Sequence, residues 1–125
     1  MAGSYPELEA FIGFYPTSDL TITQNFYGHI LGLPLARDQG NCLIFQIAET
    51  SYVGFCHHDR PFHLHPGLIL TLVTDDVDGV YQRLLDHEVQ VEGVPKTDET
   101  YRIYHFFTRD PDGHRVEVQR FLDPL

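Results

Sequence analysis

Hydrophobic and polar residues recur with two different periods along the chain, and the order of these periods predicts an α+β fold. Runs in which they alternate predict strands at residues 9–16, 33–38, 42–48, 52–57, 68–73, 89–93, 101–108 and 114–121. Runs with hydrophobic residues three and four positions apart predict amphipathic helices, from about residue 21 to 31 and from about 77 to 87. The side chains expected on their buried stripes are Ile22, Phe26, Tyr27, Ile30 and Leu31 in the first helix and Val77, Val80, Tyr81, Leu84 and Leu85 in the second. The predicted order is one strand, one helix and three strands, given twice, with a polar loop at residues 95–100.

The two sets of elements are separated by residues 58–67, where two prolines and a glycine predict a linker. This division places a first module at about residues 8–57 and a second at about 68–121. Thr17-Ser18-Asp19-Leu20 and Thr74-Asp75-Asp76-Val77 each precede a predicted helix. The pattern is therefore an internal duplication within a single domain of 125 residues.

The last predicted strand follows a tight turn, Asp110-Pro111-Asp112-Gly113, in which the proline and glycine favour chain reversal. Val116 and Val118 fall on one face of this strand. Its other face carries three polar side chains, those of Arg115, Glu117 and Gln119. We expect the valines to pack under a helix and the polar face to line a cavity.

These features resemble the vicinal oxygen chelate superfamily, which includes glyoxalase I, extradiol dioxygenases, fosfomycin-resistance enzymes and bleomycin-resistance proteins. The matching motifs are Asp110-Pro111-Asp112-Gly113-x-x-x-Glu117, Phe26-Tyr27-x-x-Ile30-Leu31-Gly32-Leu33 and Thr74-Asp75-Asp76-Val77-Asp78. The resemblance implies two modules whose eight strands form an open, barrel-like sheet around a cavity, with the helices outside.

Metal-using members of that superfamily resemble one another in three ligand positions. These are a His on the first strand, a His or carboxylate on the first strand of the second module, and a Glu on the last strand. Here Glu117 fills the last position, but Ile12 and Ile69 fall on the others and cannot bind a metal ion. We therefore expect no cofactor at the standard position. The alternative is a divalent ion held elsewhere, by His58 or His65 together with Glu117.

The cavity implied by the resemblance is the candidate ligand site, with Glu117 on its floor as general base or ligand anchor. The alternative for Glu117 is a structural carboxylate paired with Arg115 or held by Gln119. The other expected lining residues are Ile12, Phe14, Tyr52, Cys56, Ile69, Thr71, His105, Arg115 and Gln119. An apolar-aromatic pocket with one acidic anchor favours a neutral or cationic small molecule.

Charge and cysteine content narrow the function classes further. The net charge of −10 argues against nucleic acid and against an anionic membrane surface as partners. Cys42 and Cys56 lie in strand-like runs without Cys-x-x-Cys spacing, which predicts two buried, reduced thiols. The first ten residues lack the basic start and apolar core of a signal peptide, so we expect a cytoplasmic location.

Two main functions fit these observations. The first is a metal-free binding protein for an aromatic or cationic compound, like the bleomycin-resistance members. The second is a metal-dependent lyase, isomerase or extradiol-type dioxygenase acting on a substrate with vicinal oxygens. A third alternative is a structural or regulatory domain. Half-barrel modules leave strand edges and apolar faces uncovered, and the linker permits modules to pair between chains, so we expect a homodimer.

Overall fold

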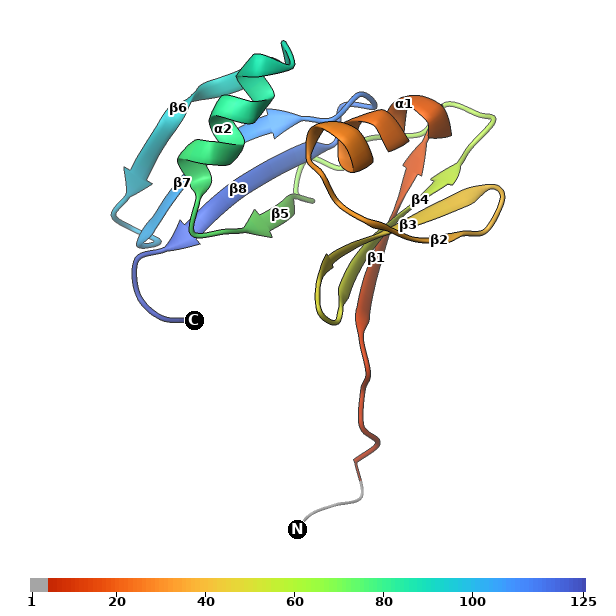
Figure 1. Cartoon of the computed structure of the whole chain (residues 1–125), viewed down its shortest axis with the longest axis horizontal. Coiled ribbons are helices and arrows are strands. Elements are labelled where there is room, and N and C mark those ends of the chain that lie inside the picture. The colour runs from red at the N-terminus through yellow and green to blue at the C-terminus, as the bar shows by residue number, and fades with distance from the viewer. Residues whose placement is uncertain (1–4) are drawn as a thin grey trace.

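The structure is a computed structural model that describes residues 5–125. It contains two modules side by side, each with a sheet and with helical structure on one face of that sheet (Figure 1). The elements of the first module are β1 (Phe11–Thr17), α1 (Leu20–Gln24), η1 (Asn25–Ile30), β2 (Leu35–Asp38), β3 (Cys42–Ala48) and β4 (Ser51–His57). Those of the second are β5 (Leu70–Val73), α2 (Val77–Asp86), β6 (Val91–Asp98), β7 (Ile103–Arg109) and β8 (Arg115–Phe121).

Both sheets have the same strand order and the same pattern of directions. The order is β1-β4-β3-β2 in the first sheet and β5-β8-β7-β6 in the second. β1 is parallel to β4 and β5 is parallel to β8, while the other neighbours are antiparallel. The predicted pair of βαβββ modules with outer helices is confirmed. The eight strands form two separate four-stranded sheets, which together make the open, barrel-like arrangement.

The core of each module lies between its helices and its sheet. Val116 and Val118 are fully buried under the helix of the second module, as expected from their face of the last strand. In the first module the rings of Tyr27 and Phe55 are stacked with their centroids 4.2 Å apart. The opposite, concave face of each sheet is therefore free of helices and positions the candidate site.

The helix of the first module is less regular than predicted. Asp19 begins it by accepting a hydrogen bond from the backbone N of Thr21 at 2.9 Å. From Asn25 the helix widens into the π-helical segment η1, in which the backbone N of Leu31 donates to the carbonyl of Phe26, five residues earlier. The wider turn rotates the buried stripe relative to the 3.6-residue pattern.

This rotation corrects one expected core residue. Ile22, expected on the buried stripe, is exposed, and Thr23 is buried in its place. The hydroxyl groups of Thr23 and Thr17 lie 2.6 Å apart, so the buried threonine is hydrogen bonded to the end of β1.

The helix of the second module follows its predicted pattern closely. Asp76 caps α2 by accepting a hydrogen bond from the backbone N of Gly79 at 2.9 Å, and Val77 and Leu84 are buried. Leu85, expected to be buried beside Leu84, is 39% exposed because it lies at the edge of the stripe. No helix within residues 5–125 is long and apolar enough to cross a membrane.

β6 is longer than the sequence predicts. Residues 95–100 were expected to form a polar loop, but β6 continues through Pro95 to Asp98. Proline cannot donate a ladder hydrogen bond, yet it is tolerated here because β6 is the edge strand of its sheet and its pairing is irregular between Glu92 and Lys96.

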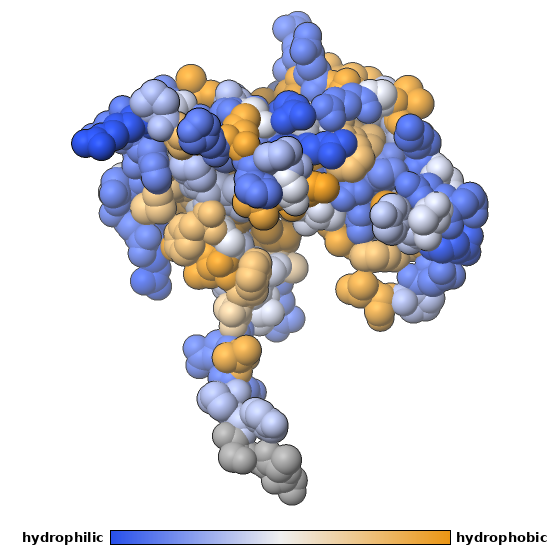
Figure 2. Space-filling view, turned by 180° about the vertical axis from the view of Figure 1, so that it is seen from behind, coloured by the Kyte–Doolittle hydropathy of each residue, from blue (hydrophilic) through white to orange (hydrophobic). Residues whose placement is uncertain are grey.

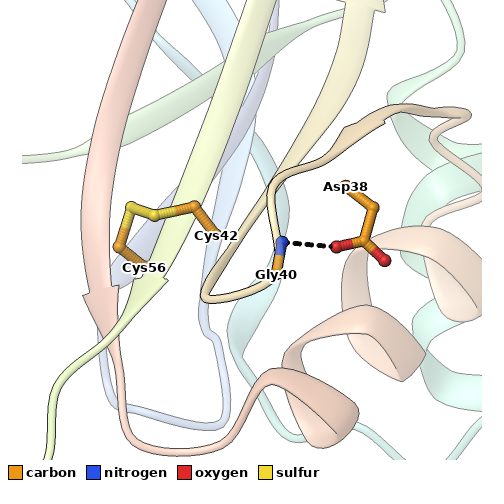
Figure 3. The surroundings of a disulfide bond; sticks show 4 residues. All are labelled: Asp38, Gly40, Cys42 and Cys56. Carbon is orange, nitrogen blue, oxygen red and sulfur yellow. Dashed lines mark hydrogen bonds between the residues drawn. A yellow bond between two sulfur atoms is a disulfide. The ribbon is translucent and has the colours of Figure 1, made fainter.

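The two cysteines form a disulfide, and the prediction of reduced thiols is wrong. Cys42 of β3 and Cys56 of β4 face each other in the antiparallel register, with their Cα atoms 4.1 Å apart (Figure 3). The turn before β3 is closed by a hydrogen bond from the backbone N of Gly40 to Asp38 Oδ1 at 2.8 Å. Because strand register was not considered in the sequence argument, the pairing was missed, and it removes one reason for expecting a reducing compartment.

Candidate functional site

Glu117 lies at the centre of a hydrogen-bonded network on the concave face of the second sheet. Its Oε2 is 2.6 Å from Nδ1 of His105, and its Oε1 accepts a hydrogen bond from the Thr71 hydroxyl at 3.2 Å. The amide nitrogen of Gln119, in the orientation that satisfies both groups, donates to Oε2 at 3.0 Å. Glu117 is 8% exposed and His105 is 7% exposed, so this is a nearly buried polar network.

Strand register brings these residues together. Thr71 of β5 lies opposite Glu117 of β8, and His105 of β7 lies opposite Gln119. Alternation then points all four side chains away from the helix-covered face. Of the two partners expected for a structural Glu117, Gln119 contacts it, whereas the ion-pair partner of Arg115 is Glu92.

Arg115 occupies the neighbouring position on the same face. Its guanidinium carbon lies 3.8 Å from the centre of the Phe107 ring. Its Nε is 3.8 Å from Glu92 Oε1, and Nε of Arg109 is 3.4 Å from Glu92 Oε2. One carboxylate therefore sits between two guanidinium groups beside the buried network.

The concave face of the first sheet is apolar, in contrast with that of the second. A hollow of about 370 Å³ on this face is lined by Ile12, Phe14, Ala36, Arg37, Gln39, Ile44 and Tyr52. Phe14 is 53% exposed, and the space-filling view shows hydrophobic surface on this lobe above the N-terminal segment (Figure 2). A β-carbon on Gly54, the β4 partner of Phe14, would overlap the ring, so the glycine lets the ring lie against the sheet.

A second cavity, of about 460 Å³, lies between the modules. Its walls come from the end of β1, the linker, and the ends of β7 and β8. The lining residues are Phe14, Tyr15, Pro16, His63, Leu64, His65, Pro66, Leu68, Arg109, Gly113, His114 and Arg115. Phe14 lines both this cavity and the hollow on the first sheet, so the two spaces adjoin at its ring.

The Asp110–His114 turn fastens the second module to the first. Asp110 Oδ2 accepts a hydrogen bond from the Tyr27 hydroxyl at 2.7 Å, and Asp112 Oδ1 accepts from the Ser18 hydroxyl at 2.7 Å. Nε2 of His114 lies 2.7 Å from the carbonyl of Pro16. Gly113 has a φ of 92°, which supports the turn predicted from the sequence.

Burial controls the ionisation of the carboxyl and phenol groups in this turn contact. Burial raises the pKa of Asp110 and raises that of Tyr27 well above its usual value, with the neighbouring Asp110 charge adding to the second effect. Burial would also raise the pKa of Asp112. Hydrogen bonds from Thr17 and Ser18 outweigh this effect, so the pKa of Asp112 is lowered. These groups are engaged in structural contacts.

The residues at the superfamily's metal positions do not fit a divalent ion. The β5 residue that lies opposite Glu117 is Thr71, and the expected position, Ile69, precedes that strand; neither side chain is a usual metal ligand. The position on β1 remains Ile12, whose β4 neighbour is Tyr52. Among these groups only Glu117 has a side chain that commonly ligates metal, and its oxygens are paired.

Neither His58 nor His65 belongs to a group of three or more ligand-type side chains that meets within residues 5–125. Within residues 5–125, the group of ligand-type side chains that meets is Asp110, Asp112 and His114, which is committed to the module contact. His58 lies against the ring of Phe62, and His65 Nδ1 accepts a hydrogen bond from the backbone N of Gly67 at 3.0 Å. Consecutive histidines in the sequence had suggested a proximity that the linker does not produce.

Several residues of the site were missed by sequence reasoning. Phe107, Arg109 and Glu92 were not singled out, although Phe107 follows His105 by two positions and therefore shares its face of β7. The basic residues of the linker were considered as metal ligands only. Extending the alternation argument from β8 to β7 would have found Phe107 and Arg109.

Comparison with known proteins gives a consistent result for the fold. The sequence model of the Glyoxalase/Bleomycin resistance protein/Dioxygenase superfamily matches residues 10–118. No curated protein sequence matches. Because the structural matches below are all under 25% identical, they support the fold alone.

Three solved structures illustrate this similarity. An integron cassette protein from the Halifax Harbour sewage outfall metagenome is 17% identical, with a TM-score of 0.78, over 90% of this chain and 97% of that one. A glyoxalase/bleomycin resistance protein/dioxygenase from Alicyclobacillus acidocaldarius is 19% identical, with a TM-score of 0.72, over 91% and 92%. A lactoylglutathione lyase from Agrobacterium tumefaciens is 21% identical, with a TM-score of 0.71, over 93% and 96%.

Proposed function

The chain belongs to the glyoxalase/bleomycin resistance protein/dioxygenase superfamily, and we propose that it binds a small organic molecule between its modules without a metal ion at the superfamily's standard position. The observation that supports this proposal is the cavity of about 460 Å³ that both modules and the linker enclose. Its size falls in the range of roughly 300–1,000 Å³ that is usual for small-molecule sites.

The shape of the surface favours a flat, aromatic molecule. Phe14 presents an exposed ring to the cavity and to the apolar hollow beside it, and such a ring stacks well on another planar group. A cationic ligand was expected from the sequence because Glu117 was the presumed anchor. Since Glu117 is already paired with His105 and Thr71, a cation would have to compete with those donors.

The test is a titration of ¹⁵N-labelled protein with three aromatic probes of similar shape: benzoate, benzamide and benzylamine. We expect at least one of them to shift the amide signals of the cavity wall. Phe14→Ala should weaken that binding about tenfold. Phe11→Ala is the matched control, because Phe11 is on the same strand, is exposed and lines neither space. Equal losses in both variants, or no shifts with any probe at millimolar concentration, would refute the proposal.

One observation favours a second function, acid–base catalysis without a metal. Nδ1 of His105 is held by Glu117, and this is the side-chain hydrogen bond that His105 makes within residues 5–125. A carboxylate that fixes one ring nitrogen of a histidine leaves the other nitrogen oriented to take up and return a proton. The reaction class would be proton transfer at carbon, as in an isomerase or lyase acting on a compound with vicinal oxygens.

This second function is tested with 2-hydroxyacetophenone, whose C–H bond next to the carbonyl is acidic. In D₂O, His105 would remove that proton and solvent would return a deuteron, so NMR would show exchange at this carbon. His105→Gln should abolish the protein-dependent exchange, while His87→Gln, in which a half-buried imidazole is lost elsewhere, should not change it. If the exchange rate were the same with and without the protein, no catalysis would be taking place.

We also propose that the protein is a homodimer. β1 and β5 are each the first strand in the order of their sheet, so each has one edge that is not paired within residues 5–125. Ile12 and Phe14 of β1 are exposed on the concave face. A second copy could cover these groups, as the linker geometry permits. Light scattering should give about twice the chain mass of 14.4 kDa, and a monomer at micromolar concentration would end this proposal.

A further inference from the structure

We infer that the molecule bound between the modules carries a carboxylate, which the guanidinium of Arg115 receives beside the ring of Phe107. This inference rests on the proposed function, because it names the chemical class of the ligand for the same cavity. The protein as a whole has a net charge of −10, yet five basic side chains and no carboxylate from the described residues line this cavity. They are His63, His65, Arg109, His114 and Arg115.

Arg115 has an unused set of hydrogen-bond donors. Within residues 5–125 its side chain donates no hydrogen bond, and its Nε is buried without an acceptor. The nearest oxygen of Glu92 is 3.8 Å away, too far for a hydrogen bond. Because Nε itself is shielded from solvent, a ligand oxygen in the cavity would be received by the terminal N–H groups of Arg115, which also donate no hydrogen bond within residues 5–125.

The guanidinium also packs against an aromatic ring. Its carbon lies 3.8 Å from the centre of the Phe107 ring, so the ring covers one side of the group. Two parallel N–H groups of a guanidinium match the two oxygens of a carboxylate. Because stacking fixes the side chain before binding, less conformational entropy is lost when the ligand arrives.

Charge balance at this end of the cavity supports an anion. Glu92 lies 3.4 Å from Arg109 and 3.8 Å from Arg115, so one carboxylate faces two guanidinium groups. One positive charge remains uncompensated in this cluster. A bound carboxylate would neutralise it, whereas an amine would add a third positive charge beside two existing ones.

The remaining walls suit the rest of such a ligand. Phe14, Leu64 and Leu68 offer apolar surface to an aromatic or aliphatic body. Because Nδ1 of His65 accepts a hydrogen bond from Gly67, the neutral form of that ring carries its proton on Nε2 and has one further donor in the cavity wall. The site therefore combines an apolar body region with donors for a single acidic group.

The experiment compares benzoate, benzamide and benzylamine on the full chain, with the Nε–H signal of Arg115 followed by ¹⁵N NMR. These probes share a ring and differ in charge and donor pattern. We expect benzoate to bind at least about tenfold more tightly than benzamide and to shift the Arg115 signal. Benzylamine should bind more weakly than benzamide. This measurement uses the unaltered protein, so it does not depend on the folding of a variant.

Substitution then locates the effect. Arg115→Gln should remove the preference for benzoate, leaving benzoate and benzamide with similar affinities. Arg120→Gln is the matched control, because Arg120 is on the same strand and also lies near an aromatic ring, that of Tyr104, but outside this cavity. Its binding preference should be unchanged.

The outcomes separate the two proposals. If benzamide or benzylamine binds in the cavity as well as benzoate does, the carboxylate inference is wrong while the proposed function stands. Benzoate binding that leaves the Arg115 signal unmoved, or that survives Arg115→Gln undiminished, also overturns the inference. If no probe binds, both proposals fail.

Discussion

The two modules share one topology but present opposite chemistry on their concave faces. The first sheet carries Ile12, Phe14 and Tyr52, with the Cys42–Cys56 disulfide on the same side. The second carries the buried network of Glu117. On the helix-covered faces the modules remain alike, since both are packed with apolar side chains.

This difference shows which positions the fold constrains. A residue facing a helix must fill a close-packed space, so its replacement is limited by volume and polarity in both modules. A residue on the concave face contacts no helix, and its chemistry is free to differ between the modules. Here the difference produces a cavity with an apolar wall on one side and donors on the other.

The largest effect is expected from the core of the second module. Leu84 is fully buried, so Leu84→Ala should lower the free energy of unfolding by about 2–5 kcal/mol. Leu85→Ala should lower the free energy of unfolding by less than about 1 kcal/mol, because the Leu85 side chain is partly exposed. Denaturant unfolding followed by circular dichroism measures both. Equal losses would show that α2 does not bury the stripe described.

The disulfide gives the first module a covalent link that the second does not have, because both cysteines of the chain are used in it. It closes a segment with a sequence separation of 14 residues, for which loop-closure entropy predicts a stabilisation of about 3 kcal/mol. Unfolding with and without a phosphine reductant tests this, with a Cys42→Ala/Cys56→Ala variant as the reductant-insensitive control. Intact-mass analysis after thiol alkylation would contradict the pairing if two alkyl groups were added without reduction.

The contact between the modules depends on the Tyr27 hydroxyl. Tyr27→Phe removes its buried hydrogen bond to Asp110 and should cost about 1–3 kcal/mol. That hydrogen bond lowers the pKa of Asp110 against the effect of burial, so its loss should raise this pKa further. The cost should therefore be full at neutral pH and smaller in acid, where Asp110 is protonated. A cost that does not change with pH would argue against this partner.

A smaller pH effect is expected from Asp112, whose pKa is shifted in the opposite direction from that of Asp110. Its pKa is lowered in the folded state, so its ionised form stabilises the protein above the unfolded-state pKa, and this stabilisation is lost as pH falls through the lowered value. Asp112→Asn should cost about 1 kcal/mol at neutral pH because the contacts with Ser18 are exposed to solvent. The gap between the two proteins should close in strong acid. A gap that widens there would reverse the assigned direction.

Sequence periodicity predicted the modules, the strand order along the chain and the faces of β8, because these depend on local alternation. It did not predict η1 or the extension of β6 through Pro95, which depend on packing and on the position of the strand in its sheet. The disulfide could have been predicted. Residues 42 and 56 are each seven positions from residue 49 in the predicted turn, so a hairpin centred there places them opposite each other.

The site was predictable in part for the same reason. Alternation correctly placed Glu117 and Gln119 on one face, and His105 was among the expected cavity residues. How close these side chains come to one another depends on the register between strands. The alternation within a single strand does not determine that register. That Thr71 lies directly opposite Glu117 could not be read from the sequence for this reason.

Pro95 has a consequence for how the protein avoids polymerising. The outer strands β2 and β6 are where another chain would add to each sheet and seed fibrous growth. β6 contains Pro95, which has no N–H to offer, and β2 has only four residues with a register shift. Both outer rims are therefore poor templates for strand addition. The homodimer proposed above would therefore have to form at the free edges of β1 and β5 rather than at these outer strands.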